Sequence, residues 1–185
     1  NVTFNDTVNS EATEANNLTL NVGGTLDFQG EVGQAADGAL GTLNTLGTGT
    51  TTFSTANASA AVLDFDQAVV LEESTTLEGT TSIDFASTVN SAATEANDLT
   101  LNSPLVSFND TAGQAVDGAL GTLETDAAGT TTFAANAASV DAGTTTFNDS
   151  VVADTTGNSL TFNVDSANFN GTLNSTAADA DSISV

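Results

Sequence analysis

Carboxylates are the side chains of this sequence with the clearest acid–base chemistry. Two close pairs are candidates, Asp64 with Asp66 and Glu72 with Glu73. Glycoside hydrolysis uses such a pair, one acid and one base or nucleophile across the scissile bond. The chain has no Lys, Arg or His to hold an acidic sugar and no Trp or Tyr on which a sugar could stack. We therefore expect these carboxylates to be solvated surface groups, and we expect no enzyme activity.

Oxygen-bearing pairs also follow phenylalanines, at Asn5-Asp6, Asn109-Asp110 and Asn148-Asp149. Ca²⁺ prefers Asp, Asn and carbonyl oxygens, so these pairs would form an oxygen ladder if their strands stack in register. Asn and Asp are also ordinary turn residues, and the Gly-rich nonapeptide of calcium-binding repeats is absent. We favour the turn interpretation and expect no cofactor, with calcium as the weaker alternative.

Three threonine tracts form a third candidate, at Thr50-Thr51-Thr52, Thr130-Thr131-Thr132 and Thr144-Thr145-Thr146. In a strand, two hydroxyls of each tract would share one face. Flat arrays of this kind occur on ice-binding solenoids, whereas Thr also simply suits exposed strand positions. Because only three tracts occur, at unequal spacing, ice binding is the lesser alternative.

The charge of the chain excludes several classes of function. The sequence of 185 residues has 24 Asp and Glu and no Lys or Arg, for a formal net charge of −24. Without basic residues it has no phosphate clamp for nucleic acid and no electrostatic grip on an anionic membrane. No apolar run approaches the ~20 residues of a membrane-spanning helix. The chain opens on Asn1 with no signal-peptide pattern, so we expect a processed chain or a segment of a longer one.

An internal repeat is the strongest signal in the sequence. Asn9–Asn21 matches Asn90–Asn102 at 11 of 13 positions, with an offset of 81. Gly33–Phe53 matches Gly113–Phe133 at 16 of 21 positions, with an offset of 80. We therefore divide a single repeat domain, residues 1–185, into module 1 (1–81), module 2 (82–163) and a partial repeat (164–185).

Short strands build each module. An apolar–polar–Phe phrase recurs, as in Leu26-Asp27-Phe28 and Leu63-Asp64-Phe65, and alternation with period two indicates a half-buried strand. Helix is the competing interpretation for Ser10–Asn16 and Gln34–Leu40 and their copies. These stretches are short and end near Asn or Gly, so we expect loops or turns there.

Short strands repeated every ~20–25 residues predict an all-β fold, a parallel β-solenoid or β-helix. We expect eight or nine coils, with one Phe per coil stacked on its copies above and below. The expected core phenylalanines are Phe28, Phe53, Phe65, Phe85, Phe108 and Phe133.

The phrases Thr3–Val8 and Gly143–Val151 resemble the strand repeats of large bacterial surface proteins, of the filamentous-haemagglutinin and autotransporter passenger type. The resemblance covers nearly the whole chain through composition and implies right-handed parallel β-helices that project from the cell surface.

We accordingly expect a non-enzymatic, extracellular stalk, adhesin passenger or matrix element that contacts the cell surface or matrix. It would bind no nucleic acid and insert into no membrane. The alternative is a self-assembling head-to-tail filament or surface-layer subunit, because the ends of a solenoid are open strand edges.

Overall fold

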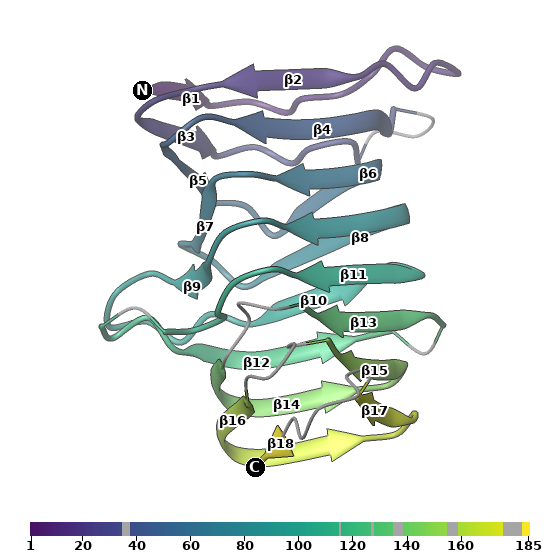
Figure 1. Ribbon diagram of the computed structural model, residues 1–185. Coiled ribbons are helices and arrows are strands. Elements are labelled where there is room, and N and C mark those ends of the chain that lie inside the picture. The colour runs from purple at the N-terminus through teal and green to yellow at the C-terminus, as the bar shows by residue number, and fades with distance from the viewer. Residues whose placement is uncertain (35–37, 115, 127, 135–138, 155–158, 176–182) are drawn as a thin grey trace.

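The structure is a computed structural model that describes residues 1–34, 38–114, 116–126, 128–134, 139–154, 159–175 and 183–185. Throughout these residues the chain is all-β, and no helix is present in them. Parallel strands wind into a solenoid whose turns stack from the N-terminal to the C-terminal end (Figure 1). The predicted parallel β-solenoid is confirmed.

Each turn passes through three parallel ladders, which we call faces 1, 2 and 3 in chain order. Face 1 contains β1 (Val2–Phe4), β3 (Thr25–Phe28), β5 (Thr50–Phe53), β7 (Ala68–Leu71), β9 (Val89–Ser91) and β18 (Ile183–Ser184). Face 2 contains β10 (Leu99–Asn102) and β12 (Leu120–Thr125). Face 3 contains β2 (Leu18–Asn21), β4 (Leu40–Leu46), β11 (Leu105–Phe108), β13 (Thr130–Phe133), β15 (Ser150–Ala153) and β17 (Leu173–Ser175).

Four long strands bend around a corner and join two faces. β6 (Asn57–Phe65) and β8 (Thr75–Phe85) run from face 2 to face 3. β14 (Ser139–Phe147) and β16 (Leu160–Phe169) run from face 1 to face 2. These bends connect the ladders into a single 13-stranded sheet beside the 5-stranded sheet of β1, β3, β5, β7 and β9.

The coil makes about seven complete turns, slightly fewer than the eight or nine predicted. Seven steps along the ladder of face 1 lead from Val2 to Phe162, and the two-residue strand β18 adds a short last step beyond them. The prediction assumed coils of nearly uniform length, but the coils differ. On face 1, one turn runs from Thr50 to Ala68, whereas a longer one runs from Ala112 to Val140. At ~4.8 Å per turn, seven turns form a rod ~34 Å long.

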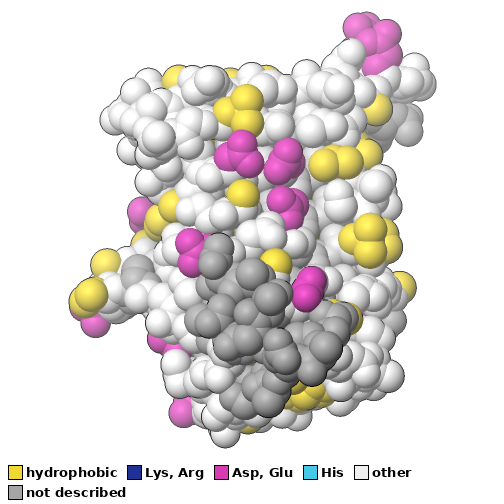
Figure 2. Space-filling model, viewed as in Figure 1, with side chains coloured by type: hydrophobic (Ala, Val, Ile, Leu, Met, Phe, Trp, Pro, Cys, Tyr) yellow, Lys and Arg dark blue, Asp and Glu magenta, His cyan; other side chains and the backbone are white. Residues whose placement is uncertain are grey.

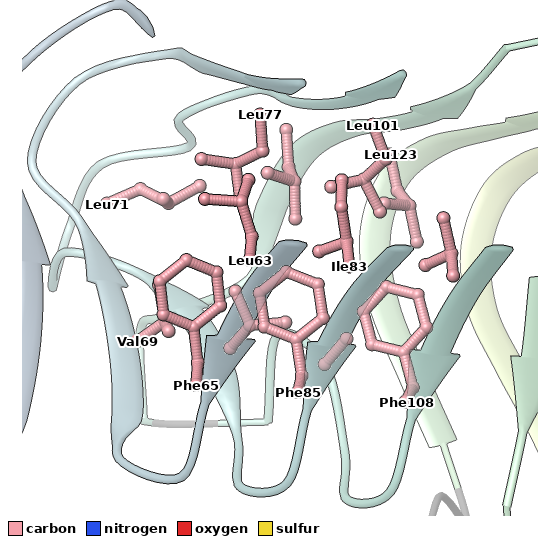
Figure 3. Close-up of a cluster of buried hydrophobic side chains, with 14 of the residues drawn as sticks. Leu63, Phe65, Val69, Leu71, Leu77, Ile83, Phe85, Leu101, Phe108 and Leu123 are labelled. Carbon is pink, nitrogen blue, oxygen red and sulfur yellow. The ribbon is translucent and has the colours of Figure 1, made fainter. Parts of the chain in front are cut away.

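The interior is a continuous row of stacked apolar side chains. All six phenylalanines predicted for the core are at most 1% exposed. Phe65, Phe85 and Phe108 lie in one row on neighbouring strands, with Leu63 and Ile83 beside them (Figure 3). Their ring centroids are 5.4 and 5.1 Å apart. Burial of these rings and the adjacent leucines is the main stabilising contribution to the fold.

The expectation of one continuous phenylalanine column is wrong, because nine of the ten rings form three columns and Phe162 lies apart from them on face 1. Phe4, Phe28 and Phe53 stack on face 1, and Phe65 begins a second column on face 3. Where the phenylalanines move from face 1 to face 3, the rings of Phe53 and Phe65 meet edge to face, with 87° between their planes. The third column, on face 2, pairs Phe147 with Phe169. Short Phe spacings in the sequence therefore mark a step to another face.

The sequence repeat corresponds to a fractional number of turns. Phe4 pairs with Phe28, Phe28 with Phe53 and Phe53 with Leu71, which are three steps along face 1. The chain then crosses face 2 and reaches Phe85, the counterpart of Phe4, on face 3. One module thus advances the coil by three turns and two further faces. Corresponding residues of the two modules consequently lie on different faces.

The stretch Ser10–Asn16 forms turns, as predicted, and the competing helix interpretation is wrong there. The Ser10 hydroxyl donates to the Glu14 carbonyl at 2.8 Å and accepts the Asn16 backbone N–H at 3.0 Å. Thr13 has a φ of 70°, which is incompatible with a right-handed helix. The copy is built alike, with the Asn97 N–H donating to Ser91 Oγ at 2.9 Å and Thr94 at φ 68°. Of Gln34–Leu40, residues 35–37 lie outside the described residues, as does residue 115 of its copy.

Candidate functional site

One interior corner in each module buries a large polar side chain, whereas most of the other buried polar residues are threonines and serines. In module 1, Gln67 is 2% exposed at the corner between β6 and β7. Its Nε2 donates to the carbonyl oxygens of Val22 and Leu46, both at 2.6 Å. Its Oε1 accepts a hydrogen bond from the Thr51 hydroxyl at 3.0 Å. A neutral amide can satisfy all three partners because it both donates and accepts.

The corresponding corner of module 2 holds an acid. Asp149 follows Phe147 by two residues, as Gln67 follows Phe65, and it is 3% exposed. Its Oδ1 accepts from the Thr125 hydroxyl at 2.7 Å and its Oδ2 from the Thr131 hydroxyl at 2.8 Å. These two hydrogen bonds offset part of the cost of burying this side chain.

A second carboxylate lies close to this buried acid. Asp126 stands where module 1 has Leu46, and its Oδ1 is buried without a hydrogen-bond partner. Burial raises the pKa of Asp126 most, the Ser103 backbone hydrogen bond lowers it, and the charge of Asp149 raises it further. Asp126 and Asp149 form a carboxylate pair with no basic side chain anywhere in the chain to balance it. Sequence reasoning missed the pair, although the offset that aligns Phe65 with Phe147 also aligns Gln67 with Asp149.

The predicted pair Asp64 and Asp66 lies on the outer surface, and the structure brings a third acid to it. Asp64 and Asp84 are paired in register on β6 and β8. Burial raises the pKa of Asp64 most, followed by the charges of Asp66 and Asp84. Asn44 Nδ2 donates to Asp64 at 3.0 Å, and Asn109 Nδ2 donates to Asp84 at 2.8 Å. Along this ladder, hydrogen bonds from two amide groups therefore stabilise the carboxylates, a role that Lys or Arg side chains often have in other proteins.

Glu72 and Glu73, the other candidate pair, are both exposed between β7 and β8. The acids remain distributed over the surface, and Figure 2 shows Asp and Glu side chains scattered across one flank with no Lys or Arg between them. No group of three or more potential metal-ligating His, Cys, Asp or Glu side chains occurs among the described residues.

The three Asn-Asp pairs do not stack on one another, so the oxygen ladder considered for calcium does not form. Asn5-Asp6 follows β1 on face 1, Asn109-Asp110 follows β11 on face 3, and Asn148-Asp149 follows β14 on face 2. Asn148 of the last pair instead accepts a hydrogen bond from Asn170 Nδ2, at 2.8 Å from its Oδ1. The fractional turn of the repeat is the reason for this separation.

The threonine tracts are separated in the same way. Thr51, Thr131 and Thr145 point inward and are fully buried. Their flanking threonines lie on the other side of each strand, on β5 of face 1, β13 of face 3 and β14 of face 2, and one of them, Thr52, is only 9% exposed. The tracts thus supply no common flat array of hydroxyls.

A shallow groove of about 400 Å³ lies on the outside of face 3, across β8, β11 and β13. Its lining residues are Ser82, Ile83, Asp84, Leu105, Val106, Ser107, Thr130 and Thr132. Leu105 is 56% exposed and is the one exposed large apolar side chain among these lining residues. Asp84 is the one carboxylate among these eight residues, whereas glycoside hydrolysis requires two.

Comparison with known proteins leaves the fold as the main guide to function. No protein-family model, no curated protein and no solved structure matches the chain. Among the described residues there is also no helix long and apolar enough to cross a membrane.

Proposed function

We propose that this protein is a non-enzymatic structural or adhesive rod, a stalk or passenger segment of a cell-surface or matrix protein. Its function in this proposal is its shape and its outer surface. It resembles the filamentous-haemagglutinin and autotransporter passenger repeats in its strand phrases, and the solenoid fold agrees with that resemblance.

The observation that carries the proposal is the use of nearly all interior side chains for stacking. Inward positions hold Phe, Leu, Val, Ile and small residues in register from turn to turn. The buried polar side chains Gln67 and Asp149 are occupied by contacts between neighbouring turns. Such a rod resists bending because every turn is hydrogen-bonded to the next.

The proposed extracellular location is supported by the composition. Trypsin-like proteases cleave after Lys or Arg, and the chain offers neither. The density of acid groups keeps such a surface hydrated and disfavours non-specific association. Both properties suit a protein exposed to secreted proteases.

Labelling of intact cells tests this proposal. Antibodies raised against the folded chain are applied to the producing cells before and after permeabilisation and located by immunogold electron microscopy. We expect gold on the outer surface or in the matrix of intact cells. Label confined to permeabilised cells would refute the extracellular assignment, and a cytoplasmic marker detected in parallel controls for cell leakage.

A further inference from the structure

Two rows of side chains run along the outside of face 3, across the neighbouring strands β6, β8 and β11 (Figure 1). Listed from β6 to β11, the first row is Val62, Ser82 and Leu105, and the second row is Asp64, Asp84 and Ser107. Alternate residues of these strands are buried in the core, so both rows lie on the outer side. An apolar row therefore lies beside an acidic row.

The shallow groove on face 3 lies over these rows and continues onto β13. Leu105 and Asp84 both line the groove, and Leu105 is 56% exposed. The two rows are two residues apart on each strand, which is ~6.6 Å along the strand direction. The groove thus presents an apolar group and a carboxylate at a fixed spacing.

This combination of side chains differs from that of the corresponding strands in module 1. When the modules are aligned on the phenylalanines that end the strands, Leu105 stands where module 1 has Thr25, and Asp84 stands where it has Thr3. Threonine suits an exposed strand position, so the strand forms without the leucine or the acid. The surface on face 3 is consequently a local feature and not a property of every repeat.

The acidic row has no Lys or Arg side chain of this chain to balance it. Asn44 and Asn109 donate hydrogen bonds to Asp64 and Asp84, but these amides carry no charge. Burial raises the pKa of Asp64 most, and the charges of Asp66 and Asp84 raise it further. The row therefore attracts a cationic group from another molecule, whereas a second copy of this chain, also of charge −24, is repelled.

We propose that this groove binds an extended, basic segment of a partner protein. The segment places an apolar side chain on Leu105 and, two residues away, an Arg or Lys side chain beside Asp84. Alternate residues of an extended chain face the same side and are also ~6.6 Å apart, so a segment laid along the strands matches both rows. This inference rests on the proposed adhesive function and names the class of partner.

A synthetic peptide tests the proposal on the purified 185-residue chain. The probe is a fluorescently labelled peptide of about eight residues in which Leu and Arg alternate with Thr, so that each Leu is two residues from an Arg. One control peptide has Ser in place of each Leu, and the other has Glu in place of each Arg. Fluorescence anisotropy should show the probe binding about tenfold more tightly than the Ser peptide, with no binding of the Glu peptide.

Two variants of the groove and two matched controls locate the binding. Leu105→Thr installs the residue type of module 1 and should weaken binding of the probe about tenfold. Asp84→Asn should weaken it about fivefold, because one exposed ion pair is lost. The controls are Val116→Thr, at a side chain that is 88% exposed between β11 and β12, and Glu72→Gln, at an exposed acid between β7 and β8. Both controls should bind the probe like the wild type.

Amide chemical shifts of the isotope-labelled chain give an independent location, and the largest changes should fall on β8, β11 and β13. Equal affinity for the probe and the Ser peptide, unchanged binding by both groove variants, or shifts centred on another face would overturn the proposal. Each result would reduce the interaction to a general attraction of cations by an acidic surface. Circular dichroism and thermal melting establish that every variant is folded. A folded chain that does not bind the probe would overturn the docking and leave the extracellular rod, which cell labelling tests separately, intact.

Discussion

The corresponding corners of the two modules bury different polar side chains, a neutral amide in one and a carboxyl group in the other. Module 1 places the neutral Gln67 against two carbonyl oxygens and one hydroxyl. Module 2 places Asp149 against two hydroxyls and beside Asp126. The two positions correspond in the repeat, and each side chain has hydrogen-bond partners that suit it, so we infer that hydrogen-bond matching decides which side chain a corner holds.

The matching is incomplete in both modules, at different atoms. The Thr45 hydroxyl, which corresponds to that of Thr125, is buried without a partner in module 1. In module 2 the unpaired atom is Asp126 Oδ1. Each of these corners therefore contains one buried oxygen without a hydrogen-bond partner. Substitutions at or near these two atoms should change the stability of the two modules by different amounts.

The largest effect is expected from exchanging the charge state at each corner with isosteric changes. Gln67→Glu points a carboxylate oxygen at the carbonyls of Val22 and Leu46 and should cost about 3–5 kcal/mol at pH 7. Asp149→Asn should stay within about 1 kcal/mol, because a threonine hydroxyl can accept from the new amide. Urea unfolding followed by circular dichroism measures both, and equal costs would refute the matching argument.

Substitutions of the two threonines should change the stability less, and in opposite directions. Thr125→Val removes a donor from the buried Asp149 and should cost about 1.5–3 kcal/mol. Thr45→Val removes a hydroxyl that has no partner and should be neutral or stabilise by up to about 1 kcal/mol. Thermal melting distinguishes them, since 1 kcal/mol corresponds to about 2–4 °C in a chain of this size. A destabilised Thr45→Val would show that this hydroxyl has a partner in solution.

Part of the fold was predictable from the sequence, but the changes of face and the polar corners were not. The strands, the stacking and the burial of Phe28 through Phe133 follow from alternation and the internal repeat, because those patterns reflect periodic burial. The change of face after Phe53 and Phe133 was not foreseen, since a shorter spacing to the next phenylalanine does not reveal at which corner the chain bends. Asp126 was missed because the groups around it, the Ser103 backbone and Asp149, lie 23 residues away on either side in the sequence, and a linear pattern does not show that they meet.

The smallest expected effect concerns pH. The folded state raises the pKa of Asp126 above its ordinary value of 3.8, mainly through burial. A raised carboxyl pKa favours folding below that value, and the contribution is lost as pH rises through the folded pKa. We expect the melting temperature to rise as pH falls from 7 towards 4.

Asp126→Asn should reduce the rise in melting temperature between pH 7 and pH 4. The matched control Glu72→Gln removes a carboxyl group that is exposed, and it should reduce the rise less. Differential scanning calorimetry across this pH range makes the comparison. Identical pH profiles for the wild type and both variants would show that Asp126 titrates like a surface carboxylate.

The fractional advance of the repeat has a consequence for recognition. A receptor that binds one module finds the equivalent surface of the next module turned towards a different side of the rod. Three consecutive modules of this type would complete eleven turns, about 53 Å at ~4.8 Å each, before the first orientation returns. An array built in this way displays its epitope radially, so that neighbouring copies engage separate receptors and cannot both be held by one flat opposing surface.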